Sequence, residues 1–326
     1  MKVPVMSPEL LYLSNAHVQA LQISAREARE AVLSAFRDNA AGRNIGLPKS
    51  AIPITKGSFI SMSSVSQADG IATTKWVAVV PVEGSQTRSR INGLVCVSDY
   101  ETGVPIAVLD GNSVTLIRTA AMSAAAAAYL APDAPATIGL IGCGLQALSH
   151  LDAFVDLFPS LRRIHLLSRS VSSAEKIAAA ASEKKLDSII SNDPDNLVSE
   201  CEIVVSMVPS YTGLNAFLDA RLLPSSSFAS AVDGGRSWRP ETLTSFDRLI
   251  TDSLEQSTSP VDASNRPVEY VRYQEDLGRL ASGSSRPRAP IKAFFGFRGF
   301  VIADLALAEL AIRKARALGV GTMLPR

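Results

Sequence analysis

Residues 137–147 read Thr-Ile-Gly-Leu-Ile-Gly-Cys-Gly-Leu-Gln-Ala, an apolar run that leads directly into the pattern G-x-G-x-x-A. In this pattern Gly142 permits a tight turn, Gly144 lets backbone approach a pyrophosphate, and Ala147 allows a helix to pack closely on the preceding strand. The first turn of that helix would present free N–H groups to phosphate. Because a strand, the motif, a helix and a second strand follow in order, the stretch predicts a dinucleotide-binding unit.

The chain after this motif alternates short β-branched runs with helical patterns, which is typical of a parallel sheet. Helices are expected over 145–157 and 173–184. Six strands with helical connections predict a doubly wound, Rossmann-type domain. These strands are expected at 137–141, 163–167, 189–191, 203–207, 228–232 and 249–251.

The chain before the motif has a different pattern. A helix is expected over 25–41, and turn signals separate the strand-like segments after it. This predicts an α+β arrangement that is largely antiparallel. The segments are 51–54, 59–65, 73–80, 93–98 and 105–109.

Two helices and a loop complete the predicted organisation. An alanine-dense helix over 117–130 is expected to join the two domains, and the segment 281–290, rich in Ser, Arg and Pro, to form a surface loop. A last helix over 302–318, with no strand after it, is expected to return to the first domain. The predicted fold class is α/β: a Rossmann doubly wound sheet plus a discontinuous α+β domain. The expected domains are 1–130 with 298–326, and 131–297.

The composition excludes several classes of protein. The 326 residues carry a formal charge of +1 and only 19% charged residues, without the basic excess of a nucleic-acid binder. No run of about 18 apolar residues is free of Pro, Gly or charge, so no membrane span is expected. The first nine residues hold two prolines and an acid, which argues against a signal peptide. Three widely spaced cysteines favour a reduced, cytoplasmic setting.

Metal and triad chemistry are also not expected. The three histidines share no spacing with one another or with cysteine that suits a metal. The chain has no G-x-S-x-G elbow of the kind that carries the nucleophile of many hydrolases.

The residues after the second expected strand bear on the choice of dinucleotide. An NAD enzyme usually places Asp or Glu there for the ribose 2′-hydroxyl, but this chain has Ser168, Arg169 and Ser170. A guanidinium and two hydroxyls could bind a 2′-phosphate through charge-assisted hydrogen bonds. The sequence therefore favours NADP(H), with NAD(H) possible. The alternative is that Arg169 stacks beside the adenine or faces solvent.

Several segments in combination resemble the ornithine cyclodeaminase/mu-crystallin family. The similarity extends from about Arg26 to Leu318 and includes the glycine motif with Gln146 and the residues 294–304. The segments GIATTKWV at 70–77 and TLIRTAA at 115–121 are specific in combination, and DYETG at 99–103 and VLDG at 108–111 fit the region between them.

This resemblance implies a Rossmann domain, a second domain that binds substrate and pairs the subunits, and a homodimer. The family includes ornithine cyclodeaminases, alanine dehydrogenases, and ketimine and pyrroline-carboxylate reductases. Its members handle a hydride at the α-carbon of an amino acid or its imine. The implied partner is therefore a small amino-acid or imino-acid substrate, with neither nucleic acid nor membrane.

Two residues fall on the family's active-site positions. Lys75 matches the active-site lysine, which can hold a substrate carboxylate or exchange a proton with an amine or imine. Arg118 matches an arginine that binds the substrate α-carboxylate, where the planar guanidinium can engage both carboxylate oxygens. The alternatives are a solvated Lys75 at a strand edge, and an Arg118 paired with Asp110 or another acid.

The other candidates surround these two positions. Where relatives often have a second carboxylate-binding arginine after a proline, this chain has Lys49, which keeps the charge without the bidentate fork. Met62 is a further candidate for substrate binding. The candidates for cofactor binding are Arg118, Thr119, Gly142, Gly144, Leu145, Gln146, Ser168, Arg169, Ser170, Met207, Val208, Pro209 and Asp233.

The segment 231–238, Ala-Val-Asp-Gly-Gly-Arg-Ser-Trp, departs from the cyclodeaminase pattern. An ungapped match puts Gly235 where the cyclodeaminases carry an aspartate, with Asp233 two residues earlier. Either Asp233 substitutes in a remodelled loop, and is then catalytic, or the aspartate is missing. The second interpretation is preferred here.

The leading hypothesis is therefore an NAD(P)H-dependent reductase of a small imino acid that also works as an amino-acid dehydrogenase. Lys75 or Asp233 would keep the imine protonated, and Arg118 with Lys49 would orient the carboxylate. The alternatives are cyclodeamination of ornithine with bound NAD, and a non-catalytic, crystallin-like protein that binds the cofactor.

Overall fold

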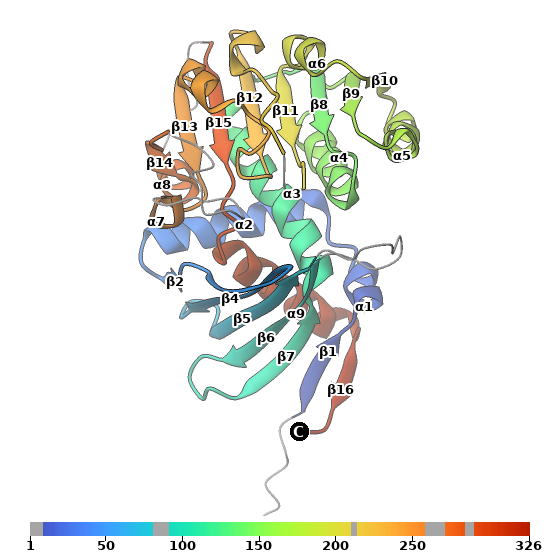
Figure 1. The fold of residues 1–326 in the computed structure, drawn as a ribbon. Coiled ribbons are helices and arrows are strands. Elements are labelled where there is room, and N and C mark those ends of the chain that lie inside the picture. The colour runs from blue at the N-terminus through green and yellow to red at the C-terminus, as the bar shows by residue number, and fades with distance from the viewer. Residues whose placement is uncertain (1–8, 81–90, 210–213, 258–270, 284–289) are drawn as a thin grey trace, which may run out of the picture. The chain divides into compact units, whose positions relative to one another are not determined.

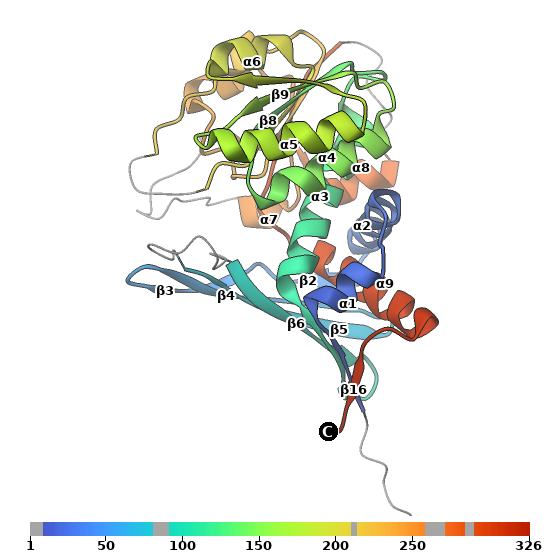
Figure 2. The ribbon, with the colours of Figure 1, turned by 90° about the vertical axis from the view of Figure 1, so that its right-hand side faces the viewer.

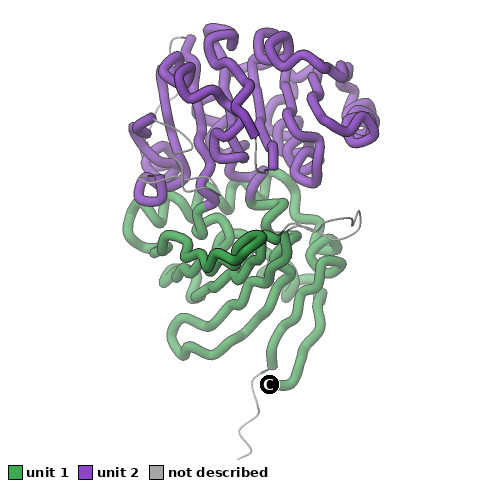
Figure 3. The backbone as a smooth tube through the Cα atoms, in the orientation of Figure 1, with its two compact units in different colours: residues 1–118, 300–326 green, residues 119–299 purple. Residues whose placement is uncertain are grey.

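The structure is a computed structural model that describes residues 9–80, 91–209, 214–257, 271–283 and 290–326. The chain divides into two compact units, residues 1–118 with 300–326 (unit 1) and residues 119–299 (unit 2) (Figure 3). The first division falls at Arg118, inside helix α3 (Gly111–Leu130), whereas the expected domain boundary lies at residue 130. The helix also begins earlier than 117, because the Asp110 carboxylate accepts the Ser113 N–H at 2.8 Å and supports its first turn.

Unit 2 contains an eight-stranded sheet in which every strand pair is parallel (Figure 1). The chain starts at a central strand, adds strands on one side, and then crosses to the other side, which is the doubly wound topology. The order is β10 (Asp187–Ser191), β9 (Arg163–Leu167), β8 (Thr137–Ile141), β11 (Ile203–Ser206), β12 (Ser227–Ala231), β15 (Lys292–Gly296), β13 (Arg248–Thr251) and β14 (Glu275–Asp276).

Two strands of this sheet, β14 and β15, are not among the six that the sequence predicts. Strand β15 lies between β12 and β13, and its residues 293–296 are buried. The expected loop over 281–290 is wrong at its start, because α8 (Leu277–Gly283) continues to Gly283. Residues 284–289 lie outside the described residues. Strand β15 was not predicted because it directly follows a polar segment and because its sequence, Lys-Ala-Phe-Phe-Gly, has no β-branched residue.

Helices connect the parallel strands of unit 2. Figure 2 shows α4 and α5 over the sheet near β8 and β9. Ser170 caps α5 by accepting the Ser173 N–H, and Asp193 caps α6 in the same way through two N–H groups. The helices and short 3₁₀ turns are α4 (Leu145–Leu157), α5 (Val171–Glu183), α6 (Pro194–Glu200), η1 (Ala220–Leu222), η2 (Pro240–Ser245), α7 (Leu254–Ser257) and α8.

Unit 1 is built on a second sheet, antiparallel except where β1 pairs with β7. The expectation of no strand after the last helix is wrong, because the short β16 pairs with β1 at the sheet edge. The order is β16 (Thr322–Leu324), β1 (Leu10–Leu13), β7 (Pro105–Asp110), β6 (Ile91–Asp99), β5 (Ile71–Val79), β4 (Gly57–Ser66) and β2 (Asn44–Gly46), with β3 (Ser50–Ile54) also paired to β4.

The two faces of this sheet differ. Helix α9 (Ile302–Leu318) packs against β2, β4, β5 and β6, and α2 (Ala25–Ala40) packs on α9. Along β5 the residues Ile71, Thr73, Lys75 and Val77 are buried, while Trp76 points to the opposite, exposed face. Helix α1 (Asn15–Ala20) contacts β7. The period of two therefore places Lys75 on the helix-covered face.

Helix α3 is the one helix of the described chain that is long and apolar enough to cross a membrane. Within the structure, however, 78% of its apolar stretch is buried. Burial of this extent is what a helix in a protein core shows.

Candidate active site

Lys75 lies in the middle of β5 with only 1% of its surface exposed, which overturns the alternative of a solvated lysine. Its Nζ donates to Asp304 Oδ1 at 2.9 Å and to the Thr115 hydroxyl at 2.7 Å. Thr115 in turn donates to the Gly111 carbonyl one turn earlier in α3. An ammonium carries three N–H bonds, so this geometry leaves one for a ligand.

Arg118 joins the same cluster from α3. Its Nε lies 3.3 Å from Asp304 Oδ1, the oxygen that also receives Lys75. Asp304 is fully buried in the first turn of α9. Arg118 therefore lies beside an acid, but this acid is Asp304 and not Asp110, and the contact engages Nε.

The electrostatics of this cluster follow from its burial and charge. Burial lowers the pKa of Lys75 to about 8; Asp304 opposes this shift, while Arg118 and Lys49 add to it. An amine with a pKa near neutrality can both give and take a proton.

Two further substrate-binding candidates belong to unit 1. Met62 is the cross-strand neighbour of Lys75 on β4 and is buried on the same face. Lys49 is an exposed residue between β2 and β3 that acts on Lys75 through its charge. Unit 1 thus concentrates positive charge around one buried lysine.

The glycine motif of unit 2 fits a dinucleotide. Gly142 has φ +96°, and a Cβ there would lie 2.8 Å from the Met207 carbonyl oxygen. Gly144 has open space where its Cβ would stand, and no side chain of the described residues caps the helix α4 that it begins. Leu145 is 70% exposed and Gln146 half-buried at this terminus. The free N–H groups therefore face a space that a phosphate can fill.

The other cofactor-binding candidates also follow the carboxyl ends of parallel strands. Met207, Val208 and Pro209 come after β11, and the Met207 N–H donates to the Ile141 carbonyl at 2.7 Å. Parallel strands end at a common edge, so these residues and Gly142 lie beside the point where the strand order reverses between β8 and β11. Ligands of doubly wound sheets bind at that point.

Residues after β9 form a polar turn at the N-terminus of α5. The Ser168 hydroxyl accepts the Ser170 N–H at 3.2 Å, and Ser170 caps the helix. Ser168 is half-buried, while Arg169 and Ser170 are exposed. Thr119, by contrast, is buried in α3.

Asp233 follows β12 and is held inside unit 2. Its carboxylate accepts hydrogen bonds from the Ser206 hydroxyl at 3.1 Å, the Gly235 N–H at 3.1 Å and the Ser237 hydroxyl. Burial raises the pKa of Asp233, and these donors oppose that shift. Trp238 Nε1 donates to Ser206 and extends the network. Both carboxylate oxygens are thus engaged in holding the turn.

Comparison with known proteins agrees with this architecture. The profile of the ornithine cyclodeaminase/mu-crystallin family matches residues 9–317. The chain belongs to this family. The fold class predicted from the sequence is confirmed by solved structures that the chain resembles over nearly its whole length.

Relatives within the ornithine cyclodeaminase/mu-crystallin family are distant but match end to end. An alanine dehydrogenase of Archaeoglobus fulgidus is 26% identical over 97% of this chain and 98% of its own. A Δ1-pyrroline-2-carboxylate reductase of Bacillus cereus is 24% identical over 95% and 98%. The structure of an archaeal alanine dehydrogenase dimer with bound NAD has a TM-score of 0.85 and 25% identity, covering 97% of this chain and 99% of that one.

Two members of the Lys75 cluster escape prediction from the sequence. Asp304 lies 229 residues from Lys75 in the chain, and Thr115 lies 40 residues from it. The available signal for Asp304 is one acid in an otherwise apolar stretch, Ile-Ala-Asp-Leu-Ala-Leu-Ala at 302–308. A buried acid needs a partner, but the sequence does not show which cation supplies it.

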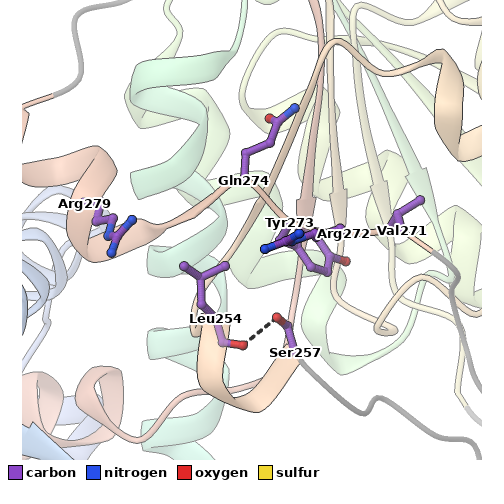
Figure 4. Close-up of a pocket in the computed structure, with 7 residues that line it drawn as sticks. All are labelled: Leu254, Ser257, Val271, Arg272, Tyr273, Gln274 and Arg279. Atoms are coloured by element: carbon purple, nitrogen blue, oxygen red, sulfur yellow. Dashed lines mark hydrogen bonds between the residues drawn. The ribbon is translucent and has the colours of Figure 1, made fainter.

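A separate pocket of about 790 Å³ lies beside β14, at that edge of the unit 2 sheet (Figure 4). Leu254 and Ser257 of α7 line it, together with Arg272, Tyr273 and Arg279. It contains none of the residues proposed for the cofactor or the substrate, which places it outside the candidate site.

Proposed function

We propose that this chain is an NAD(P)H-dependent reductase of a small imino acid that also runs as an amino-acid dehydrogenase at the α-carbon. The observation that carries the proposal is the buried cluster of Lys75 and Arg118 around the single carboxylate of Asp304. A net positive, water-poor site of this kind favours a substrate carboxylate beside a group that can exchange a proton.

The proposed roles follow from the chemistry of each side chain. The planar guanidinium of Arg118 binds the α-carboxylate, and Lys49 adds charge at the exposed side. Lys75 donates a proton to the imine nitrogen, which makes the adjacent carbon electrophilic. Bound NAD(P)H supplies the hydride for that carbon. Fixing the carboxylate orients the C=N bond for this transfer.

Asp233 enters the proposal as a residue that holds the turn after β12, and not as a second acid or base. Its oxygens are committed to Ser206, Gly235 and Ser237. Cyclodeamination needs a carboxylate free to assist ring closure, so this engagement favours reduction over the cyclodeaminase alternative. The intact Lys75 cluster likewise favours catalysis over a purely binding role.

A substrate panel followed by nicotinamide absorbance tests the proposal. Cyclic imino acids, 2-oxo acids with ammonia, and L-ornithine are each supplied with NADPH and with NADH. We expect steady cofactor consumption with an imino acid, and little proline or ammonia from ornithine. Robust proline release from ornithine with only catalytic cofactor would instead establish the cyclodeaminase, with Asp233 freed for chemistry.

We further propose that NADPH is preferred to NADH. The support is the polar turn after β9, where Ser168, Arg169 and Ser170 offer hydroxyls and a cation at the start of α5 and no carboxylate. A helix N-terminus adds a favourable field for a 2′-phosphate. The archaeal alanine dehydrogenase described above holds NAD, so cofactor choice is a point on which this chain would differ.

Ser168→Asp is expected to reverse the cofactor preference. The new carboxylate repels a 2′-phosphate and accepts hydrogen bonds from a 2′-hydroxyl, a change of about 1–3 kcal/mol for charged hydrogen bonds gained or lost. Titration of both cofactors into both proteins measures the ratio of the two dissociation constants. Ser182→Asp, an exposed position at the far end of α5, serves as the matched control. Equal affinities that the Ser168 variant leaves unchanged would contradict the proposal.

We also propose a homodimer formed through unit 1. The face of the sheet opposite Lys75 exposes Trp76 and Leu94, which are cross-strand neighbours, and Phe59 stacks on Trp76 with 5.6 Å between ring centroids. Apolar surface of this kind typically marks an interface. We expect an obligate contact of more than roughly 2,000 Å². Light scattering should give twice the 34.5 kDa chain mass, and a value near 34.5 kDa would refute the dimer.

A reducing, cytoplasmic setting is proposed as well. The cysteines Cys96, Cys143 and Cys201 are free, and burial raises the pKa of Cys143 to about 11. Mass analysis of protein alkylated at once on lysis should find all three thiols reduced; a disulfide would contradict this setting.

A further inference from the structure

We propose that Asp304 is a positioning residue that holds the Lys75 ammonium in place and keeps it charged for proton transfer. The proposal rests on the proposed function, in which Lys75 protonates the imine. Asp304 itself would touch neither substrate nor cofactor, and would act through Lys75.

The geometry ties Lys75 to two fixed points. Asp304 Oδ1 receives Nζ at 2.9 Å from α9, and the Thr115 hydroxyl receives it at 2.7 Å from α3. Because all three residues are anchored on secondary structure, the remaining N–H of Lys75 is confined to one direction. A buried lysine without such anchors would sample several rotamers of its long stem.

The charges around Lys75 come from three elements. Arg118 on α3 and Lys49 between β2 and β3 are cations, and Asp304 on α9 is the one anion acting on Lys75 among the described residues. Burial and both cations favour the neutral amine, so Asp304 alone opposes the loss of the proton. Removing this carboxylate would leave Lys75 and Arg118 facing each other unscreened.

Asp304 also lies in the first turn of α9, where any carboxylate stabilises a helix through its dipole. A residue with that role alone would change the stability of unit 1 at every pH. It would not move the pH at which catalysis is lost. This difference separates positioning from a structural role.

The test compares the pH profile of imino-acid reduction in the holoenzyme and in Asp304→Asn. Reduction needs the charged ammonium, so kcat/KM falls as pH rises through the pKa of Lys75. An opposite charge at this distance is worth about 1–3 pH units. We therefore expect the alkaline limb of the D304N profile to move to lower pH by about that amount, and the D304E limb to lie between those of D304N and the wild type. D304E also carries the test if D304N does not fold, because its displaced carboxylate should leave part of the same downward shift relative to the wild type.

The matched control is Glu309→Gln, which removes an acid from the same helix that pairs with Arg313 on the surface. Its profile should coincide with that of the wild type. If the alkaline limb of the kcat/KM profile lies at the same pH in the wild type, D304N and D304E, the proposal is overturned, however much the absolute rates differ.

A readout independent of turnover distinguishes this proposal from the proposed function. The Cε resonance of Lys75 in [ε-¹³C]lysine-labelled protein, assigned by its loss in Lys75→Met, reports the titration of the ammonium directly. We expect this titration to move to lower pH in D304N. If the wild type reduces no imino acid but the titration still moves, the proposed function fails and the positioning role of Asp304 stands. If the titration of Lys75 does not move in D304N, the positioning role of Asp304 is refuted, while the proposed function is unaffected.

Discussion

Lys75→Ala is expected to lower kcat/KM for imino-acid reduction by about 10²–10⁴, the usual contribution of a positioned acid–base group. The methyl group keeps neither the proton nor the charge, while Arg118 remains to bind a carboxylate. The binding of NADPH should be unchanged, because the glycine motif lies in unit 2. The loss is measured by nicotinamide absorbance with the imino acid that the panel selects.

The control for this variant is Lys56→Ala, which removes an exposed lysine from the turn between β3 and β4. We expect it to react at the wild-type rate. A Lys75 variant that retains more than about a tenth of wild-type activity would contradict an acid–base role, since a group of that kind contributes at least about 10²-fold.

The pH dependence of the wild type follows from the same residue. With a pKa near 8, the Lys75 amine is protonated below that pH and neutral above it. Reduction, which uses the acid form, should therefore be lost above about pH 8, whereas oxidation of the amino acid, which uses the base form, should rise there. If the rate of reduction falls and the rate of oxidation rises around the same pKa, a single group serves as acid in one direction and as base in the other.

The sequence predicted the strand, turn and helix around the glycine motif well, because their signal is local. Gly142, Gly144 and Ala147 occur within six residues after an apolar strand, and the backbone geometry that they require is set by their own turn. Patterns of this kind depend on neighbours in sequence, which the chain itself displays.

The Lys75 cluster could be predicted only in part, because its partners meet through tertiary structure. The family resemblance supplied Lys75 and Arg118, but the carboxylate between them comes from α9 at the other end of the chain. The role of Asp233 was also not predictable from the sequence, because it depends on contacts made in the folded structure. Spacing left open whether this acid is free for chemistry, and only its hydrogen bonds to Ser206 and Ser237 indicate that it holds a turn.

The largest effect on cofactor binding is expected from Gly144→Val. In the structure no heavy atom lies within 4 Å of the position a Cβ would take at Gly144, and its φ of −87° is allowed for any residue. The folded protein should therefore accept valine, at a cost of about 1 kcal/mol or less for a poorer residue at the start of α4. The same open space is where the pyrophosphate must approach the backbone.

Valine at this position would fill that space and keep phosphate away from the N–H groups of the first turn of α4. Each charge-assisted hydrogen bond lost is worth about 1.5–3 kcal/mol, so affinity for NADPH and NADH should fall about 100-fold or more. Calorimetric titration measures the affinity, and thermal unfolding measures the stability. Gly283→Val is the matched control, since no described heavy atom lies within 4 Å of a Cβ at Gly283 either, but this residue lies in α8, which contacts the edge strand β14. Wild-type affinity in the Gly144 variant would mean that the dinucleotide binds elsewhere, and the assignment of this motif would then be wrong.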